Sequence, residues 1–213
     1  MRLACDKCAK HGLGFYATHI SPADYIEGRH DADVWIIGLN PKGDIGVEEK
    51  RTIQDFDNFS PSSHSYFKDF SKVSRKLYDN FNSANSRVAH TDLIKCFSPS
   101  FPPVVQQNGQ QKIPNVELVI KNCIEHLMEQ LRRHTPKIII CNGSPVSREI
   151  LKVFPPPATE NWNTITSYQA DLPGTDHKFW IVLSGFIGRI DDRNKRRLGM
   201  EIEQILTQEK IEL

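Results

Sequence analysis

The sequence predicts an α/β fold, in which helices cover a mostly parallel β-sheet. Short β-rich runs alternate with longer segments of helical periodicity after the first thirty residues. With 213 residues, 38% of them hydrophobic, the chain can bury one core and is short for two. No apolar run approaches the length that crosses a bilayer, and the first ten residues resemble neither a secretory signal nor a transit peptide. We therefore expect a single domain over residues 1–213 that is soluble, cytoplasmic and monomeric.

Four segments have the composition of buried strands, because each is short and rich in Val, Ile and other β-forming residues. They are residues 33–39, 87–94, 136–141 and 178–184. Ligands of an open α/β sheet bind beyond the carboxyl ends of its strands, where the loops converge. The ends of these four segments are therefore the first place to look for a functional site.

Three further segments are expected to form helices. In residues 116–134, apolar residues recur at spacings of three and four, which places them on one face of an amphipathic helix. Residues 65–81 precede the second strand, and residues 193–210 form a closing helix with its own apolar stripe. Segments 97–115 and 153–164 are rich in Pro, Gln and Asn, so we expect them to be long surface loops.

Small or hydrogen-bonding residues follow each of the four predicted strands. In chain order, they are Gly38, Leu39, Asn40 and Pro41, then Thr91 and Asp92, then Cys141, Asn142, Gly143 and Ser144, and finally Ser184, Gly185 and Phe186. Ordinary preferences for turns and helix N-caps explain any one of these groups taken singly. Because parallel strands end at the same edge of a sheet, the four groups together predict a shared cleft.

The five cysteines fall into different environments. Cys5 and Cys8 form a C-x-x-C pair, which suits a zinc half-site, an iron–sulfur half-site or a redox pair, although no strand can precede it as a redox motif requires. Cys141 lies inside an apolar strand and is most simply a core residue. Cys96 follows a strand and Cys123 lies in a helix, so both could face the N-terminal pair. Cys123 is equally consistent with a small apolar residue on a helix face.

Taken in order, several of these motifs resemble those of the uracil-DNA glycosylase superfamily. They are the N-terminal C-x-x-C, "GLNPKG" after the first strand, "VAHTDLIKC" at the second strand, a cysteine on the following helix, and "PKIIICNGSPV" at the third strand. The resemblance covers about residues 5 to 200, and the cysteines look like those of the iron–sulfur-containing members, family 4. It implies a three-layer α/β/α sandwich around a mostly parallel four-stranded sheet.

The same resemblance implies a metal centre and its ligands. Cys5, Cys8, Cys96 and Cys123 would ligate a [4Fe-4S] cluster, which requires four thiolates, and residues 1–30 would be a metal-binding segment packed on the domain. Zinc is the alternative metal. The gap between Cys96 and Cys123 is longer than the family pattern, and segment 97–115 explains the excess as an insertion.

The first motif departs from family 4, which usually reads like "GEAPG". "GLNPKG" is closer to the "GMNP" or "GINP" of the single-strand-selective and mismatch-specific glycosylases, in which the Asn holds the attacking water. Cleavage of an N-glycosidic bond passes through an oxocarbenium-like sugar, so a neutral amide can orient water with little need for a strong base. Asn40 is therefore the expected catalytic residue.

Two positions differ from the family pattern. Ser184 stands where the family has a His that stabilises the departing base, so this role would fall to the Ser184 hydroxyl or to the N–H groups of Gly185 and Phe186. Losing such a donor costs on the order of a hundredfold in rate. Asp92 stands where an Asn pairs with the uracil edge. Because an ionised carboxylate only accepts hydrogen bonds, Asp92 suits a base edge that presents donors, or must be protonated to serve uracil.

Contacts to DNA are expected at the cleft mouth. Basic and acidic residues nearly balance, at 27 and 26, so such contacts need a local patch. "GRIDDRNKRR" follows the fourth strand, and we expect Arg189, Arg193 and Lys195 to bind phosphates around a flipped nucleotide, although the pattern also fits a solvated helix start. Asn142, Gly143, Ser144 and Gly185 would add contacts from the strand ends.

We expect a DNA repair glycosylase that hydrolyses the N-glycosidic bond of a flipped damaged base, uracil or another deaminated base. Gly38, Leu39 and Asp92 would recognise the base, and Phe59 or Phe67 would stack on it. One alternative is a catalytically weak or inactive nucleic-acid-binding member of the superfamily. Another is a zinc-stabilised α/β protein that acts on a small nucleoside.

Overall fold

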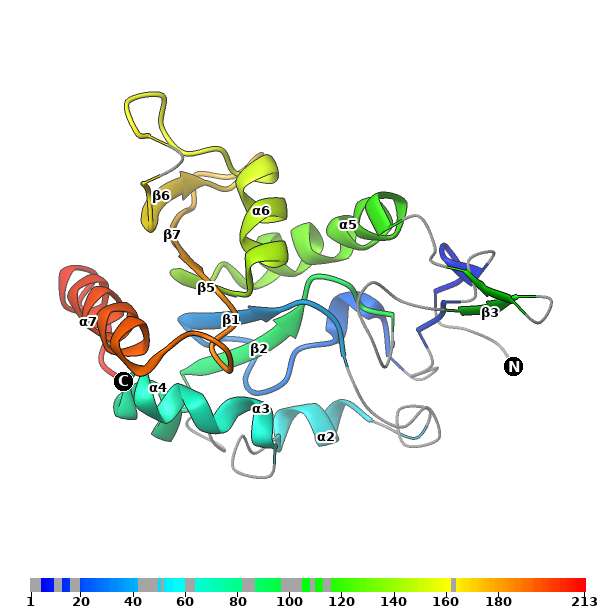
Figure 1. Ribbon diagram of the computed structural model, residues 1–213, viewed down its shortest axis with the longest axis horizontal. Helices are drawn as coiled ribbons and strands as arrows, with labels where there is room; N and C mark the ends of the chain where they lie inside the picture. The colour runs from blue at the N-terminus through cyan, green and yellow to red at the C-terminus, as the bar shows by residue number, and fades with distance from the viewer. Residues whose placement is uncertain are drawn as a thin grey trace.

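A five-stranded sheet forms the centre of the molecule (Figure 1). The computed structural model describes residues 5–9, 13–15, 20–41, 50, 52–59, 64–81, 87–96, 105–107, 110–112, 116–161 and 164–213. In this part of the chain the strands lie in the order β2 (Val88–Asp92), β1 (Val34–Gly38), β5 (Ile138–Asn142), β7 (Lys178–Ser184) and β6 (Ser167–Asp171). The first four are parallel, and β6 is antiparallel to β7.

This topology confirms the four predicted strands and the mostly parallel sheet. The fifth strand, β6, was not predicted, because "SYQAD" has little of the apolar content that marks a buried strand. As an edge strand, β6 pairs with a neighbouring strand, β7, on one side. Tyr168 is the one buried residue of β6.

Helices cover both faces of the sheet and confirm the three-layer architecture. On β1, Trp35 and Ile37 pack into one core with α5 (Val116–His134) and α6 (Ser144–Val153). Val34 and Ile36 face the opposite core. That second core is formed with α3 (Ser65–Lys68), η4 (Asp69–Lys72), α4 (Arg75–Asp79) and α7 (Asp192–Gln208). Figure 1 shows α5 and α6 on one side of the sheet and α3, α4 and α7 on the other. None of the helices described here is both long enough and apolar enough to cross a membrane.

Residues 65–81 form three short helices rather than the single helix expected. Ser74 interrupts the run, because its backbone is extended at φ −147° and its hydroxyl caps α4 by accepting a hydrogen bond from Leu77 N at 3.2 Å. The same hydroxyl donates to Glu203 Oε1 at 2.7 Å, which ties this break to α7. Periodicity alone did not reveal the break, since Ser74 does not disturb the apolar pattern on either side. Two short elements precede this region, η2 (Pro22–Asp24) and α2 (Ile53–Asp57).

The two segments expected to be loops differ in outcome. Within 97–115 the structure contains an antiparallel hairpin of β3 (Val105–Gln107) and β4 (Gln110–Lys112), so this expectation was wrong for those residues. The sequence carries Asn-Gly between the two strands, which is the favoured two-residue hairpin connection and was the missed signal. In 153–164, α6 ends at Val153, and the described residues beyond it form no helix or strand.

Gly199 allows α7 to lie directly against the chain between η4 and α4. A Cβ at this position would stand 1.8 Å from the Val73 carbonyl oxygen, which is backbone and cannot rotate away. Gly199→Ala should therefore destabilise the fold by roughly 1–3 kcal/mol, because the overpacking outweighs the better helix propensity of Ala. Urea denaturation measures this.

Met200→Ala is the matched control, because the neighbouring Met200 side chain is 73% exposed. It should change stability by less than about 0.5 kcal/mol. Equal stability of the Gly199→Ala variant and the unmodified protein would contradict the close approach of α7.

Candidate active site

The last residues of the four parallel strands form a row at one edge of the sheet. Gly38 pairs in register with Asp92, and Asn142 pairs with Ser184. The pairing of Ile37 with Cys141 brings the two halves of the row together. The structure thus gathers at one edge the strand ends that the sequence analysis grouped, which is where ligands of open α/β sheets bind.

Gly38 lets three polar side chains approach the end of β1. A Cβ there would lie 2.3 Å from Asp92 Oδ1, 2.7 Å from His90 Nε2 and 3.1 Å from Tyr66 Oη. Pairing continues beyond the strand, because Leu93 N and Ile94 N donate at 2.9 Å to the carbonyls of Gly38 and Leu39. The backbone that carries Asp92 is therefore held rigidly beside Gly38.

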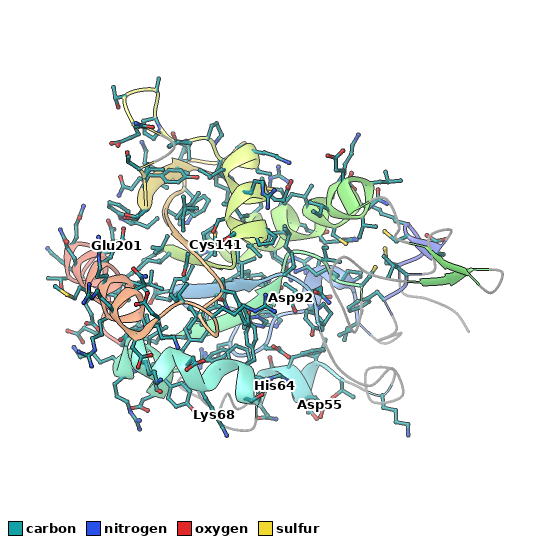
Figure 2. The ribbon with its side chains drawn as sticks, in the orientation of Figure 1. Asp55, His64, Lys68, Asp92, Cys141 and Glu201 are labelled. Carbon is teal, nitrogen blue, oxygen red and sulfur yellow. The ribbon has the colours of Figure 1, made fainter. Side chains whose placement is uncertain are left out.

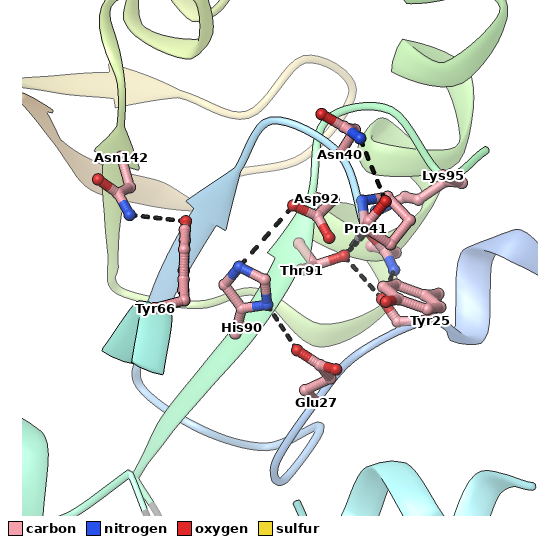
Figure 3. A network of polar contacts seen from close by, with 11 residues as sticks. Tyr25, Glu27, Asn40, Pro41, Tyr66, His90, Thr91, Asp92, Lys95 and Asn142 are labelled. Carbon is pink, nitrogen blue, oxygen red and sulfur yellow. Dashed lines mark hydrogen bonds and ion pairs between the residues drawn. The ribbon is translucent and has the colours of Figure 1, made fainter. Parts of the chain in front are cut away.

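Asn40 follows this strand end and is half-buried. Its Nδ2 donates to the carbonyl oxygen of Pro41 at 3.1 Å, which fixes the orientation of the amide (Figure 3). Asn40 follows Gly38 by two residues, and Gly38 pairs with Asp92, so Asn40 and Asp92 belong to the same end of the sheet. A neutral amide held in this way can orient a water molecule beside whatever the row of strand ends binds.

His90, a buried ionisable residue next to Asp92, was not identified from the sequence. His90 Nδ1 lies 2.8 Å from Glu27 Oε2, and the two backbones exchange hydrogen bonds of 2.7 Å in both directions. His90 Nε2 makes no hydrogen bond and lies 3.9 Å from Asp92 Oδ1. The three side chains are only 5–8% exposed, so one imidazole stands between two buried carboxylates.

The charges of this cluster shift the pKa of its members. Burial would lower the pKa of His90, but the Asp92 charge and the hydrogen bond and charge of Glu27 outweigh it, so the pKa is raised on balance. Burial, with a contribution from Asp92, raises the pKa of Tyr66. The site therefore favours an imidazolium at His90 and a neutral hydroxyl at Tyr66.

Asn142 connects two elements of the row from inside. Its Nδ2 donates to Tyr66 Oη at 2.6 Å, and its Oδ1 accepts from Ile187 N at 2.9 Å. Both ends of the carboxamide are used within the protein, and the residue is 2% exposed. In place of the expected DNA contact, the structure gives this side chain a supporting role, fixing α3 against the segment after β7.

The aromatic residues are placed differently from expectation. Phe67 is 2% exposed and packs in the core, with its ring centroid 5.0 Å from that of His90 and 4.8 Å from that of Phe81. Phe59 is half-buried against Phe67. A core position leaves Phe67 unable to stack on a base. Tyr66 reaches the end of β1, and Phe186 lies directly after β7 with its ring centroid 5.7 Å from that of Tyr66. Adjacent helix residues point in different directions, which the sequence pattern could not resolve here.

Ser184 lies beside an open cavity of about 300 Å³. Its hydroxyl donates to the Gly185 carbonyl at 2.8 Å. The Ser147 hydroxyl donates to the Ser184 carbonyl at 3.0 Å and accepts from the Ser184 N–H at 3.2 Å. The cavity is lined by Ser144, Ser147, Arg148, Leu151, Leu183, Ser184 and Gly185. Three of the predicted site residues, Ser144, Ser184 and Gly185, therefore line the same cavity at the start of α6. Gly143, which is buried, directly precedes this helix.

The basic segment after β7 divides into exposed and buried members. Arg189 and Arg193 are exposed, and the Arg189 guanidinium lies 5.9 Å from the centre of the Phe186 ring, which is itself 37% exposed. Lys195 is only 5% exposed and pairs with Asp69 at 3.1 Å and Asp192 at 3.6 Å. Its predicted phosphate contact is replaced by an internal ion pair that joins α7 to η4.

Three of the four predicted metal ligands come together. Cys8, Cys96 and Cys123 are 2–3% exposed. Hydrogen bonds to Cys123 and Cys8, together with burial, raise the pKa of the Cys96 thiol. Cys5 is half-buried, with its Sγ 3.7 Å from His126 Nε2 of α5. Cys141 lies apart in the sheet at the centre of the molecule (Figure 2).

The chemistry of these four thiols fits a metal–thiolate centre, and three of them, Cys8, Cys96 and Cys123, hydrogen-bond to one another. No group of three or more His, Cys, Asp or Glu side chains within the described ranges has a geometry set to hold a metal ion. A hydrogen bond with Cys8, together with burial, raises the pKa of the Cys123 thiol, and hydrogen bonds from Cys96 and from the Lys95 backbone N–H act in the opposite direction. Four cysteines from three segments are the ligands that iron–sulfur clusters and structural zinc use.

Lys95 is a second buried ionisable group that the sequence analysis did not identify. The side chain is 1% exposed, and Nζ bonds to Thr91 Oγ1 at 2.5 Å and Gln130 Oε1 at 2.7 Å. Burial lowers its pKa to about 7. Lys95 therefore places a titratable amine between the cysteines and the end of β2.

A protein-family model matches the part of the chain that contains the row of strand ends. The family model described as the uracil DNA glycosylase superfamily matches residues 26–185. This stretch contains all five strands of the central sheet and the row of strand ends. A search of curated proteins finds no match.

Replacing His90 by Gln should change how stability depends on pH. Because the folded-state pKa of His90 is raised, its contribution is fully present below the ordinary histidine pKa, about 6.5, and is lost as pH rises through the folded-state pKa. Relative to His90→Gln, the unmodified protein should lose up to about 1.4 kcal/mol of stability per pH unit in this window. Urea denaturation from pH 6 to 9 measures the difference.

His177→Gln is the matched control, since His177 lies near the turn between β6 and β7 and bonds to the Pro136 carbonyl at 2.8 Å. This variant should keep the pH slope of the unmodified protein. If His90→Gln also keeps that slope, the proposed charge of His90 is wrong.

Proposed function

The chain belongs to the uracil DNA glycosylase superfamily, and from this membership we propose that it is a DNA repair glycosylase that hydrolyses the N-glycosidic bond of a flipped damaged base. The observation that supports the proposal is the position of Asn40, which is held by Pro41 directly after β1, the strand whose last residue Gly38 pairs with Asp92. The family match confirms the superfamily predicted from the motifs, and this membership supports the proposal of base-excision chemistry.

Asn40 would act by orienting the attacking water. Bond cleavage builds positive charge on the sugar as the base departs, so water needs correct placement more than it needs deprotonation. The half-buried amide, with Nδ2 engaged by Pro41, is suited to hold one water beneath C1′. Extrusion of the base into the row of strand ends would bring C1′ to this water.

The exposed residues after β7 would hold the DNA strand. Arg189 and Arg193 can neutralise phosphates on either side of the flipped nucleotide. Phe186 offers an exposed aromatic face, and its neighbour Arg189 adds positive charge beside it. Ser144 and Gly185 lie at the cavity beside α6 and can add hydrogen bonds to the backbone.

Cys5, Cys8, Cys96 and Cys123 would hold a [4Fe-4S] cluster, as in the family 4 members, with zinc as the alternative. When bound, such a centre supplies cross-links between segments distant in sequence. Here it would connect the N-terminal segment to α5 and to the chain directly after β2. Its role would be to hold Asp92 and the N-terminal segment in place, without taking part in bond cleavage.

A binding protein without glycosylase activity is the second candidate function. The Ser184 hydroxyl donates to the Gly185 carbonyl, and the sequence "SGFIGR" offers no histidine to stabilise a departing base. This observation favours a member that retained the scaffold and DNA affinity without the chemistry.

Asn40→Ala should abolish base release while retaining DNA binding. Removing the group that positions water should lower the rate by on the order of a hundredfold or more. Oligonucleotides with single uracil, hypoxanthine or xanthine residues, and methylated DNA, report base release, and fluorescence anisotropy reports binding. Gln169→Ala is the control, since this exposed amide lies in the edge strand β6 and bonds to Glu209 after α7.

Base release by Asn40→Ala at the unmodified rate would remove Asn40 from the mechanism. Binding without release from any substrate would favour the second candidate function. Activity on free nucleosides without DNA binding would instead support the nucleoside-acting alternative.

Cys123→Ser should lose the bound metal, because a hydroxyl is a poor replacement for a thiolate ligand. Cys141→Ser is the matched control, since Cys141 is equally buried but lies within β5. Iron, sulfide and zinc content after anaerobic purification, with the visible absorption spectrum, measure the outcome. Equal metal content in both variants would contradict the ligand assignment.

A further inference from the structure

The charge of Asp92 follows from the groups around it. Its Oδ1 lies 3.9 Å from His90 Nε2, while the other imidazole nitrogen lies 2.8 Å from Glu27 Oε2. An imidazole is a stronger base than a carboxylate by more than about two powers of ten. A proton shared between His90 and Asp92 therefore stays on His90, and Asp92 remains an anion.

Three further titratable groups act on this pair. Glu27, on the segment bridged to β2, stabilises the imidazolium through its hydrogen bond. Lys95, from the chain after β2, has two opposing effects, because its ammonium form attracts the Asp92 charge but lowers the pKa of His90. Tyr66, from α3, presents a neutral hydroxyl. The cluster thus holds one anionic carboxylate at the end of β2, next to Gly38.

An anionic carboxylate selects among bases by charge. Uracil presents an alternation of donor and acceptor, so its carbonyl oxygens would meet the negative oxygens of Asp92 unfavourably. A positively charged base gains attraction to Asp92 instead, and solvent screens this attraction little because Asp92 is only 5% exposed.

The end of β7, at the other end of the row, also favours a positively charged base. A neutral base departs as an anion and needs stabilisation, whereas the Ser184 hydroxyl donates to Gly185 and no histidine follows in "SGFIGR". A purine alkylated on a ring nitrogen is already a cation. It accepts the electron pair of the broken bond and departs as a neutral molecule, so it needs no such donor.

We propose that the substrate is a purine made cationic by alkylation of a ring nitrogen, that Asp92 contacts its charge, and that Glu27 and His90 are positioning residues that keep Asp92 ionised. This inference rests on the proposed glycosylase function. In the reaction, the water oxygen bonds to C1′ and the C1′–N bond breaks. The electron pair of that bond neutralises the purine, and a proton from the water passes to solvent.

The substrate test compares charged and neutral lesions on the intact protein with its metal. DNA treated with a methylating agent reports release of 7-methylguanine and 3-methyladenine by chromatography, after subtraction of spontaneous release. Oligonucleotides with uracil, hypoxanthine or xanthine are tested in parallel. Methylated purines should be released at least about tenfold faster than any deaminated base, as expected for one gained charge interaction.

Faster release of a deaminated base would overturn this inference and leave the glycosylase function standing. No release from any substrate would overturn both. The two failures are therefore distinguishable in a single experiment.

Two variants test the residues. Asp92→Asn keeps the shape and removes the charge, so release of methylated purines should fall at least about tenfold while thermal unfolding confirms folding. His90→Gln should move the acidic limb of the kcat/KM profile to higher pH, because Asp92 loses its cationic neighbour. His177→Gln should leave the profile unchanged.

Glu27→Gln provides a second test if His90→Gln does not fold. It should also move the acidic limb of the kcat/KM profile to higher pH, because His90 loses the hydrogen bond that stabilises its imidazolium. Unchanged release by Asp92→Asn would overturn the role of Asp92. An unchanged acidic limb in a folded His90→Gln or Glu27→Gln variant would overturn the positioning role.

Discussion

The in-register pairing of β1 with β2 is the constraint on which the rest of the site depends. It places Gly38 opposite Asp92, and the missing Cβ of Gly38 gives room for Asp92, His90 and Tyr66 to approach the same point. A shift by one residue would turn Asp92 to the other face of the sheet, since side chains alternate along a strand. Asn40 leaves the same strand end, so its position is set by the same pairing.

The alternation along β2 also connects the two candidate centres of the molecule. Asp92 and His90 face α3, whereas Thr91 points to the opposite side, where it bonds to Lys95 and to Gln130 of α5. Lys95 directly precedes Cys96 and donates its N–H to Cys123. A metal centre at the cysteines would thus anchor the chain that leaves β2, which explains how a centre without a chemical role can still affect the pocket.

Much of the scaffold could be predicted from the sequence, because buried parallel strands and the α5 stripe leave strong apolar patterns. The polar cluster could not. Glu27 and His90 are 63 positions apart and become partners only through an isolated β-bridge. Tyr66 adjoins Phe67 in a helix, and only packing decides which ring enters the core. Lys195 reads as part of a basic run, yet Asp69, which neutralises it, lies in a distant segment.

The cost of burying charge supports a functional origin for the cluster. Removing Glu27, His90 and Asp92 from water is costly, and their mutual attraction at best offsets that cost. Packing does not require them, since Phe67 beside His90 belongs to an apolar cluster that an aliphatic side chain could extend. Perturbed ionisable groups gather at functional sites because chemistry there needs a set charge. A carboxylate held charged at the end of β2 is thus better explained by what the site binds than by the stability of the fold.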